Sequence, residues 1–394
     1  MKRRDFIKKA LATGVVATVA PSLAASAFPS IAASVGSGKR SSISPKGEKM
    51  KFSFWRADAK LAHTFTVSGS SRTSTDIVLT KVEYGGLEGY GEAAMPPYLG
   101  ETSESCMAFL ERIQGVLDKY NSPFLLDDIL TEVDLLTTNN TAAKASVDIA
   151  LHDLVGKLMG HPWYEIWGFN KEKAPDTSFT IGIDTPEVVR AKAREAAPYN
   201  LIKVKLGTDN DEALVRAIRD VEPLKPFCVD ANQGWRDKHH ALEMIHWCKE
   251  NGFIFVEQPI GKYNLDDMAW ITENSPLPTI ADESCQRLID IPKLKGVFSG
   301  INIKLMKCTG MREAYKMLTM ARAFGMKVMV GCMTETSCAI SAGAQLAPAC
   351  DWADLDGNVL IAHSSDPYDG MKVVNGKVVP TDLPGIGITK RTDL

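Results

Sequence analysis

The sequence lacks what several common classes of protein need. Its 45 Lys and Arg residues are balanced by 48 Asp and Glu residues, a formal net charge of −3, so the positive surface that nucleic-acid binding requires is missing. None of the eight cysteines stands in a C-x-x-C pair, and neither H-E-x-x-H nor G-x-S-x-G occurs. Zinc-ribbon, thioredoxin-like, metalloprotease and esterase classes therefore receive no support. The composition favours chemistry on a small molecule.

A long hydrophobic run is also absent. The apolar segment at 10–20 is too short and too rich in Ala and Thr to cross a bilayer, so no membrane span is predicted. It follows a basic start that contains Arg3-Arg4 and precedes an A-x-A cleavage site. Residues 1–27 are predicted to be a twin-arginine-like signal peptide and residues 28–50 a linker. We expect export, to the periplasm; a cytoplasmic protein with an N-terminal amphipathic helix is the alternative.

The first part of the fold, residues 51–173, has strand patterns followed by helical patterns. A hairpin is predicted over 76–94, because apolar and polar side chains alternate on both sides of a pair of glycines. Amphipathic helical patterns follow at 103–120 and 141–159. This part is expected to form an α+β domain.

From residue 174 onward, short β-branched runs alternate with helical segments. The eight runs lie at 179–183, 201–205, 227–230, 253–257, 279–282, 301–304, 327–331 and 351–354. Repeated strand–helix units of this kind form parallel sheets, and eight strands close into a barrel. Residues 174–365 are therefore predicted to form an α/β barrel domain.

Charged residues recur at the C-terminal ends of these runs: Lys205, Asp230, Glu257, Asp282, Lys304 and Asp354. All strands of a parallel barrel open on the same rim, so the three consecutive acids are gathered around one point. Clustered carboxylates repel each other unless a hard divalent cation coordinates them. Mg²⁺ fits best, and Mn²⁺ is a substitute, which makes Asp230, Glu257 and Asp282 the predicted metal ligands. The alternative is that each acid caps the helix that follows its strand.

Two lysines share one side of a predicted strand. Lys203 and Lys205 flank Val204, so their side chains point the same way, about 7 Å apart. Inside a barrel their repulsion, about 2 kcal/mol, favours the neutral form that a general base needs. Lys304 lies four strands further on, nearly opposite, with the metal between. Two bases that face each other across a cation suit removal of a proton from one face of a carbon and its return on the other; solvated lysines on an edge strand are the alternative.

Five ordered motifs carry a family resemblance: Lys203-Val-Lys205, Asp230-Ala-Asn232, Val256-Glu257-Gln-Pro259, Ala281-Asp282-Glu-Ser284 and Asn302-Ile-Lys304-Leu-Met-Lys307. As a set they resemble the enolase superfamily, in its muconate-lactonizing subgroup, over roughly residues 50 to 390. The resemblance implies a modified (β/α)7β TIM-like barrel with an α+β capping domain, to which residues 366–394 return. It also implies abstraction of a proton α to a carboxylate or carbonyl, with Mg²⁺ holding the enolate.

The resemblance assigns roles to individual residues. Lys205 and Lys304 correspond to the two acid/base catalysts, with Lys203 assisting electrostatically. The pair Asp354 and Asp356 resembles the Asp-x-Asp by which dipeptide epimerases bind the substrate ammonium group, and a buried ammonium does need acidic partners.

The substrate pocket receives weaker assignments. Arg72 resembles the capping-loop arginine of L-Ala-D/L-Glu epimerases, which contacts the glutamate side chain, as suits a guanidinium. Three further residues fall where the family lines its pocket: Thr180, Cys332 and Thr334.

We therefore expect a Mg²⁺-dependent dipeptide epimerase, with L-Ala-D/L-Glu as substrate, acting on peptides from peptidoglycan. The partner is a small-molecule dipeptide, and assembly into a homo-oligomer is compatible with the family. N-acylamino-acid racemase and o-succinylbenzoate synthase also use two lysines, but they hold no ammonium group, so Asp354 and Asp356 count against them and against a muconate cycloisomerase. A noncatalytic exported peptide-binding protein would not need opposed bases.

Overall fold

The computed structural model describes residues 47–67, 70–208 and 210–392 of the chain. The predicted signal peptide, 1–27, and most of the predicted linker lie outside these ranges. Within the described part, no helix combines the length and the apolar character needed to cross a bilayer. All eight cysteines fall inside it and are free thiols.

The chain begins with an antiparallel sheet of three strands, β1 (Lys51–Val67), β2 (Ser70–Tyr84) and β3 (Leu87–Ala94), in that order. The predicted hairpin is confirmed by β2 and β3, whose last pair is Tyr84 with Leu87. Gly85 and Gly86 between them have φ values of 62° and 74°, the left-handed pair that a tight hairpin turn requires. The sequence pattern did not single out β1, which pairs with β2 along most of its length.

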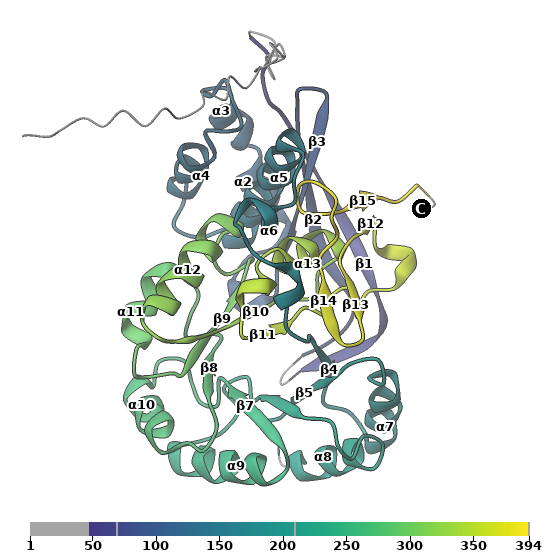
Figure 1. Ribbon diagram of the computed structural model, residues 1–394, viewed down its shortest axis with the longest axis vertical. Helices are drawn as coiled ribbons and strands as arrows, with labels where there is room; N and C mark the ends of the chain where they lie inside the picture. The colour runs from purple at the N-terminus through teal and green to yellow at the C-terminus, as the bar shows by residue number, and fades with distance from the viewer. Residues whose placement is uncertain (1–46, 68–69, 209, 393–394) are drawn as a thin grey trace, which may run out of the picture. The chain divides into compact units, whose positions relative to one another are not determined.

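Helices cover one face of this sheet and complete the capping domain (Figure 1). Their bounds are η1 Pro97–Leu99, α2 Ser103–Leu110, α3 Ile113–Leu117, α4 Leu126–Leu135, α5 Thr141–Met159, α6 Trp163–Ile166 and η2 Lys171–Lys173. The helix expected over 103–120 is interrupted, because α2 ends and α3 begins on either side of residues 111–112. The helix predicted at 141–159 is confirmed as α5, which is buried on almost all sides.

Eight parallel strands follow and confirm all eight predicted runs. They are β4 Ser178–Ile181, β5 Leu201–Lys205, β6 Phe227–Asp230, β7 Phe253–Glu257, β8 Thr279–Ala281, β9 Gly300–Lys304, β10 Lys327–Gly331 and β11 Trp352–Asp354. Each pairs with its neighbour in chain order, and a parallel bridge between Thr177 and Ala353 joins the last strand to the first. The predicted barrel with a capping domain is therefore the observed fold.

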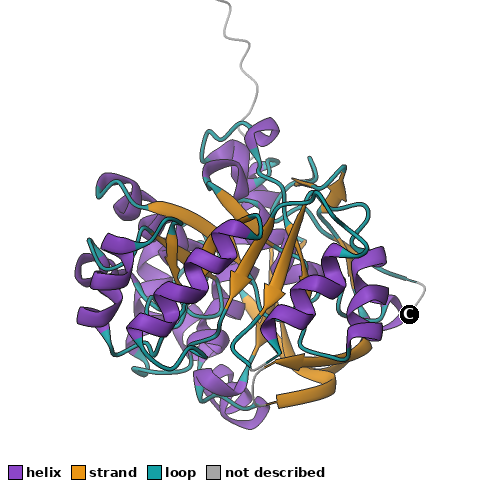
Figure 2. Cartoon of the chain, turned by 90° about the horizontal axis from the view of Figure 1, so that it is seen from below, coloured by secondary structure: helices purple, strands orange, loops and turns teal. Residues whose placement is uncertain are grey.

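The connections between these strands form the outer layer of the barrel (Figures 1 and 2). They contain α7 Pro186–Glu195, α8 Asp211–Arg219, α9 Lys238–Glu250, α10 Leu265–Asn274, η3 Leu288–Asp290 with α11 Ile291–Leu294, α12 Met311–Ala323 and α13 Ser337–Ala344. After them come η4 Ala347–Ala349, η5 His363–Ser365, β12 Tyr368–Asp369, β13 Lys372–Val374, β14 Lys377–Val379 and β15 Thr389–Lys390. Near the chain end, the amide of Ile386 donates to Asp153 Oδ1 of α5 at 3.1 Å, so the terminal segment contacts a capping helix.

The barrel interior changes from apolar to charged between successive inward-facing residues of the strands. A buried apolar layer is formed by Leu201, Cys228, Phe255, Ile280 and Met329, with Trp352 packed against it. The rings of Phe255 and Trp352 are 4.7 Å apart, which places side chains of β7 and β11 in contact inside the barrel. Residues two positions further along a strand point to the same side, so Asp230, Glu257, Asp282 and Asp354 stand directly above Cys228, Phe255, Ile280 and Trp352.

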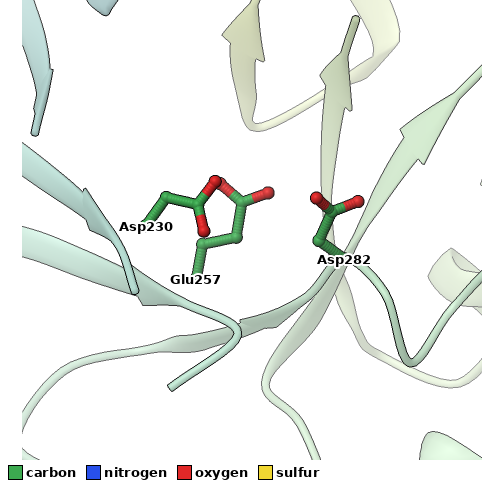
Figure 3. Close-up of side chains that lie close together, drawn as sticks. All are labelled: Asp230, Glu257 and Asp282. Carbon is green, nitrogen blue, oxygen red and sulfur yellow. The ribbon is translucent and has the colours of Figure 1, made fainter. Parts of the chain in front are cut away.

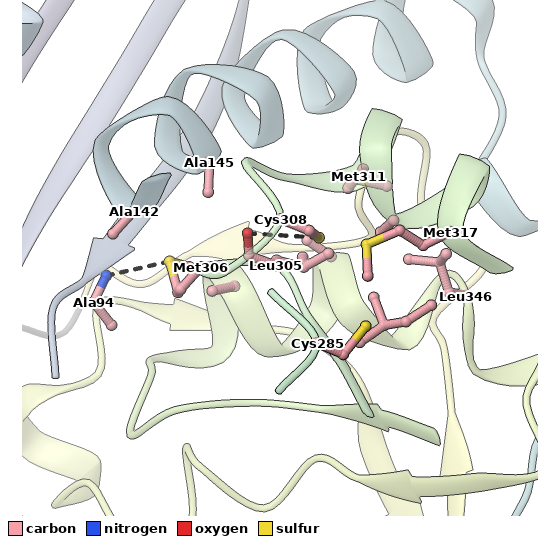
Figure 4. Packing of buried hydrophobic residues seen from close by; sticks show 14 of the residues in the cluster. Ala94, Ala142, Ala145, Cys285, Leu305, Met306, Cys308, Met311, Met317 and Leu346 are labelled. Carbon is pink, nitrogen blue, oxygen red and sulfur yellow. Dashed lines mark hydrogen bonds between the residues drawn. The ribbon is translucent and has the colours of Figure 1, made fainter. Parts of the chain in front are cut away.

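The segment that follows β9 is packed between barrel and cap (Figure 4). The thioether of Met306 accepts a hydrogen bond from the amide of Ala94 in β3 at 3.4 Å. Just beyond, Asp148 of α5 accepts from the amides of Met311 and Arg312 at 2.6 and 3.2 Å, at the first turn of α12. A capping-domain acid thus satisfies the N-terminal amides of a barrel helix.

A second capping-domain acid does the same for α13. Glu92 of β3 is fully buried and accepts from the amides of Thr336 and Ala339 at 2.9 and 3.4 Å. The two helices that follow β9 and β10 are therefore both held at their N-termini by carboxylates from the cap.

The close contact of α5 with β3 generates a stability prediction. A Cβ atom at Gly91 would lie 2.0 Å from the carbonyl oxygen of Ser146, so Gly91→Ala forces the helix away from the sheet. We expect it to lower the free energy of unfolding by about 3 kcal/mol, seen as a lower thermal midpoint by circular dichroism. Gly115→Ala is the control, because that helical position is open; it should raise stability by about 0.5 kcal/mol. Equal midpoints for the two variants would contradict this packing argument.

Candidate active site

Three acids meet at the C-terminal rim of the barrel (Figure 3). Asp230 ends β6, Glu257 ends β7 beside it in register, and Asp282 directly follows β8. Each offers a carboxylate oxygen, and these oxygens lie within 4.8 Å of one another. All three residues are buried. The structure thus brings together the three predicted metal ligands.

Lys203 provides much of the positive charge for this cluster. Its ammonium nitrogen lies 3.1 Å from Asp230 Oδ2, 2.7 Å from Glu257 Oε2 and 2.7 Å from Asp354 Oδ2. Burial alone would lower the pKa of Lys203, but Asp354, Glu257 and Asp230 outweigh it and hold that pKa well above its usual value. Lys203 is therefore a fixed cation at the centre of the site.

The two lysines predicted as acid/base catalysts stand on opposite sides of the cluster. Lys205 of β5 lies 2.6 Å from Asp230 Oδ2, and Lys304 of β9 lies 2.7 Å from Asp282 Oδ2. Four strand positions separate β5 from β9 in the eight-stranded order, so the lysines face each other across the barrel. The predicted repulsion between Lys203 and Lys205 needs a correction. In the structure Asp230 Oδ2 contacts both ammonium groups, and its negative charge offsets their repulsion.

Sequence reasoning gave no role to two residues that hold the acids in place. Lys307, fully buried, donates to Oδ1 and to the backbone oxygen of Asp282. Asn302 Nδ2 donates to Glu257 Oε1 at 2.6 Å. Both stand in the Asn302–Lys307 motif, where the polar residues flanking Lys304 were the available signal.

The donor set of the cluster fits a hard divalent cation. Carboxylate oxygens are the ligands that Mg²⁺ prefers. Glu257 Oε2 accepts no hydrogen bond of acceptable geometry from any described residue, although Lys203 lies close to it. Burial and the Asp230 carboxylate raise the pKa of Glu257, as expected for an acid whose charge is incompletely compensated. For Asp282 burial is outweighed by Lys304 and Lys307, which hold its pKa below the usual range.

A second acidic pair lies at the end of β11, where Asp354 is the last residue of the strand and Asp356 follows it. Asp354 accepts from Ser178 Oγ at 2.6 Å and contacts Lys203, whereas Asp356 Oδ2 accepts from the amide of Thr180 at 2.6 Å. Burial, followed by the charge of Asp354, raises the pKa of Asp356 to about 6. The pair predicted to bind an ammonium group therefore lies beside Lys203, with one carboxylate bound by a lysine and the other by a backbone amide.

Two of the remaining residues predicted to line the pocket lie at the same rim, and the side chain of a third is not described. Thr334 is buried in the loop after β10, and Cys332 is partly buried there, with its sulfur 3.0 Å from the position a Cβ atom would take at Gly357. Arg72 is a residue of β2 and pairs with Phe65, but its side chain is not among those described, so its predicted contact stays a prediction.

One further residue reaches the site from the cap. Tyr98, in η1, donates from its hydroxyl to the thioether of Met333 in the loop after β10, at 3.4 Å. Although 43% of the residue is exposed, burial of the hydroxyl end raises its pKa, and the charge of Asp282 adds to this rise. Sequence reasoning missed Tyr98, because its loop has no charged motif.

Family models match most of the described chain. One described as "Enolase C-terminal domain-like" matches residues 187–394, and one described as "Mandelate racemase / muconate lactonizing enzyme, N-terminal domain" matches residues 53–168. The chain therefore belongs to the enolase superfamily, in the group of mandelate racemase and muconate-lactonizing enzyme.

Known relatives of the chain indicate which class of enzyme within this superfamily it belongs to. The L-Ala-D/L-Glu epimerase of Bacteroides thetaiotaomicron is 62% identical over 345 residues, which cover 87% of this chain and 89% of that protein. The structure of the substrate-liganded L-Ala-D/L-Glu epimerase from Bacillus subtilis matches with a TM-score of 0.81 and 27% identity, covering 87% of this chain and 99% of that one. A dipeptide epimerase from Enterococcus faecalis, complexed with Mg and L-Leu-L-Tyr, matches with a TM-score of 0.80 and 31% identity, over 87% of this chain and all of that one. The present chain is an isomerase of the epimerase class.

The central position of Lys203 leads to a prediction about stability. Lys203→Met leaves three buried carboxylates without their shared cation, and loss of one partner from a buried ion pair costs about 3–5 kcal/mol. Thermal unfolding should show a clearly lower midpoint. Lys327→Met, which breaks a half-exposed pair with Asp351, should change the free energy of unfolding by less than about 1 kcal/mol. Similar midpoints for both variants would show that Lys203 does not compensate the cluster.

Proposed function

We propose that this chain is a Mg²⁺-dependent dipeptide epimerase that inverts the α-carbon of the C-terminal residue, with L-Ala-D/L-Glu as its preferred substrate. The observation that carries the proposal is the pair of lysines, Lys205 and Lys304, that flank the acidic cluster from opposite strands. An inversion needs one group to remove a proton from one face and another to return a proton on the other. The activity of the 62% identical relative, an L-Ala-D/L-Glu epimerase, supports the choice of dipeptide.

Each residue group has a part in the proposed reaction. Asp230, Glu257 and Asp282 would hold the metal ion, and Mg²⁺ bound there supplies positive charge next to the substrate carboxylate and so favours loss of the α-proton. One of the lysines takes that proton, and the opposite lysine delivers one to the other face. Lys203 stays protonated and adds positive charge.

The remaining contacts would set the substrate's orientation. Asp354 and Asp356 would bind the α-ammonium group of the first residue, because a buried ammonium needs carboxylate partners. Arg72 would contact the glutamate side chain, and Thr180, Cys332 and Thr334 would line the pocket. Mn²⁺ would replace Mg²⁺ as a hard cation of similar preference.

The reaction is tested by NMR of the purified protein with L-Ala-L-Glu in D₂O. With Mg²⁺ present we expect loss of the glutamyl α-proton signal and appearance of the L-Ala-D-Glu diastereomer, and excess chelator should stop both. Lys205→Ala and Lys304→Ala should each fail to invert the substrate. Inversion by either variant near the parent's rate would contradict the two-lysine assignment. Turnover of N-acylamino acids in place of every dipeptide tested would favour the racemase alternative.

The acidic pair generates a pH prediction. Asp356 has a pKa of about 6, above the usual value for Asp, so it is ionised above that pH and neutral below it. The substrate ammonium stays charged through this range. The KM should therefore rise as the pH falls through about 6, and this rise should be absent in Asp356→Asn, whose KM should be high throughout. A parent KM that stays constant between about pH 5 and about pH 7, where the ammonium group is charged, would contradict the role of Asp356.

We also propose that the enzyme is exported and acts on dipeptides released from peptidoglycan. The support is the basic and apolar leader with its A-x-A site, in residues 1–27. Cell fractionation of the full chain should find the shortened protein outside the cytoplasm, and replacement of Arg3 and Arg4 by Lys should keep the full-length form inside. Export that is unaffected by this replacement would contradict the twin-arginine assignment.

A further inference from the structure

The side chain of Asn232 forms hydrogen bonds with one catalytic lysine, Lys205, and with Glu283, the neighbour of Asp282. Asn232 lies two residues beyond Asp230, in the loop after β6. Lys205 Nζ donates to Asn232 Oδ1 at 3.1 Å and to Asp230 Oδ2 at 2.6 Å. On its other side, Asn232 Nδ2 donates to Glu283 Oε1 at 3.3 Å, next to Asp282.

Asp230 and Asn232, the two acceptors of Lys205, determine the direction in which its amine nitrogen can take up or release a proton. A neutral primary amine has two N–H bonds and one lone pair. If both N–H bonds point at Asp230 and Asn232, the lone pair must point away from them. When the amine gains a proton, the third N–H bond takes the direction of the lone pair. The same two contacts therefore aim Lys205 both as a base and as an acid.

The orientation of the Asn232 amide is fixed by its two neighbours. A lysine N–H needs an acceptor, which the amide oxygen provides, and the Glu283 oxygen accepts from the amide nitrogen. The backbone is held as well: the amide of Asn232 donates to Asp230 Oδ1 at 2.9 Å, and its φ of 44° lies in the left-handed region, which asparagine tolerates better than most residues.

Lys304 has a different environment. Among the described residues its Nζ donates to one acceptor, Asp282 Oδ2, at 2.7 Å. The two bases are therefore positioned by unlike means, and a change at Asn232 removes a contact from one of them only.

We propose that Asn232 is a positioning residue that aims Lys205 at the substrate α-carbon and has no corresponding effect on Lys304. The proposal rests on the function proposed above, in which the two lysines act on opposite faces. It predicts an asymmetric defect, because each diastereomer presents its α-proton to a different lysine.

The test uses Asn232→Gly in the full chain with Mg²⁺. Glycine adopts the positive φ without strain and keeps the backbone N–H that binds Asp230, so only the side-chain contacts are lost. In D₂O, α-proton exchange should fall about 10- to 100-fold for the diastereomer deprotonated by Lys205, while the other diastereomer exchanges near the parent's rate. The matched control is Asn375→Gly, at an exposed turn with φ of 51°, which should leave both rates unchanged.

Two results would overturn the proposal. Equal loss of exchange for both diastereomers would mean that Asn232 supports the site as a whole, and no loss for either would mean that Lys205 is aimed without it. A parent that exchanges neither diastereomer would contradict the proposed function instead. In that case a crystal structure of Asn232→Gly still decides the positioning claim: Lys205 Nζ should move or adopt several rotamers, and a shift below about 0.5 Å would refute it.

Discussion

Buried carboxylates in contact with buried ammonium groups determine how the C-terminal rim of this barrel is built. Lys203 touches three acids from three different strands, and Lys304 and Lys307 both bind Asp282. Removing any of these charges from water is costly, and each cost is recovered only when the strands bring its partner within hydrogen-bond distance. The geometry that suits a metal and two opposed bases is thus also the geometry that makes the charged layer tolerable inside a protein.

Much of this arrangement could be predicted from the sequence, because strand periodicity and barrel topology together specify which side chains share a level. The eight apolar runs became β4 to β11, and Asp230, Glu257 and Asp282 converged although no two are closer than 25 residues along the chain. An apolar residue two positions before Asp230, Glu257, Asp282 and Asp354 explains why the prediction holds for these four acids. It fixes which side of the strand faces the barrel interior, and the charge then follows by alternation.

Other features depend on contacts that have no signature along the chain. The break between α2 and α3 falls inside a continuous helical pattern, and the contact of Tyr98 with Met333 depends on a segment that reaches the barrel from the cap. Lys307 and Asn302 stand in a polar motif around Lys304, but only the fold shows that they contact Asp282 and Glu257. Periodicity predicts which face a side chain occupies, but not which partner it meets there.

The carboxylates of Asp148 and Glu92 have a consequence for how enzymes of this design can be recombined. They belong to the cap, yet they bind the first turns of the two barrel helices that follow Lys304 and Cys332. A chimera that takes its cap from a relative would replace these anchors together with the η1 segment, whose Tyr98 contacts Met333 after β10. An exchange of caps should therefore preserve these two acids and their facing amides, or the transplanted cap will shift the barrel helices that begin just beyond Lys304 and Cys332.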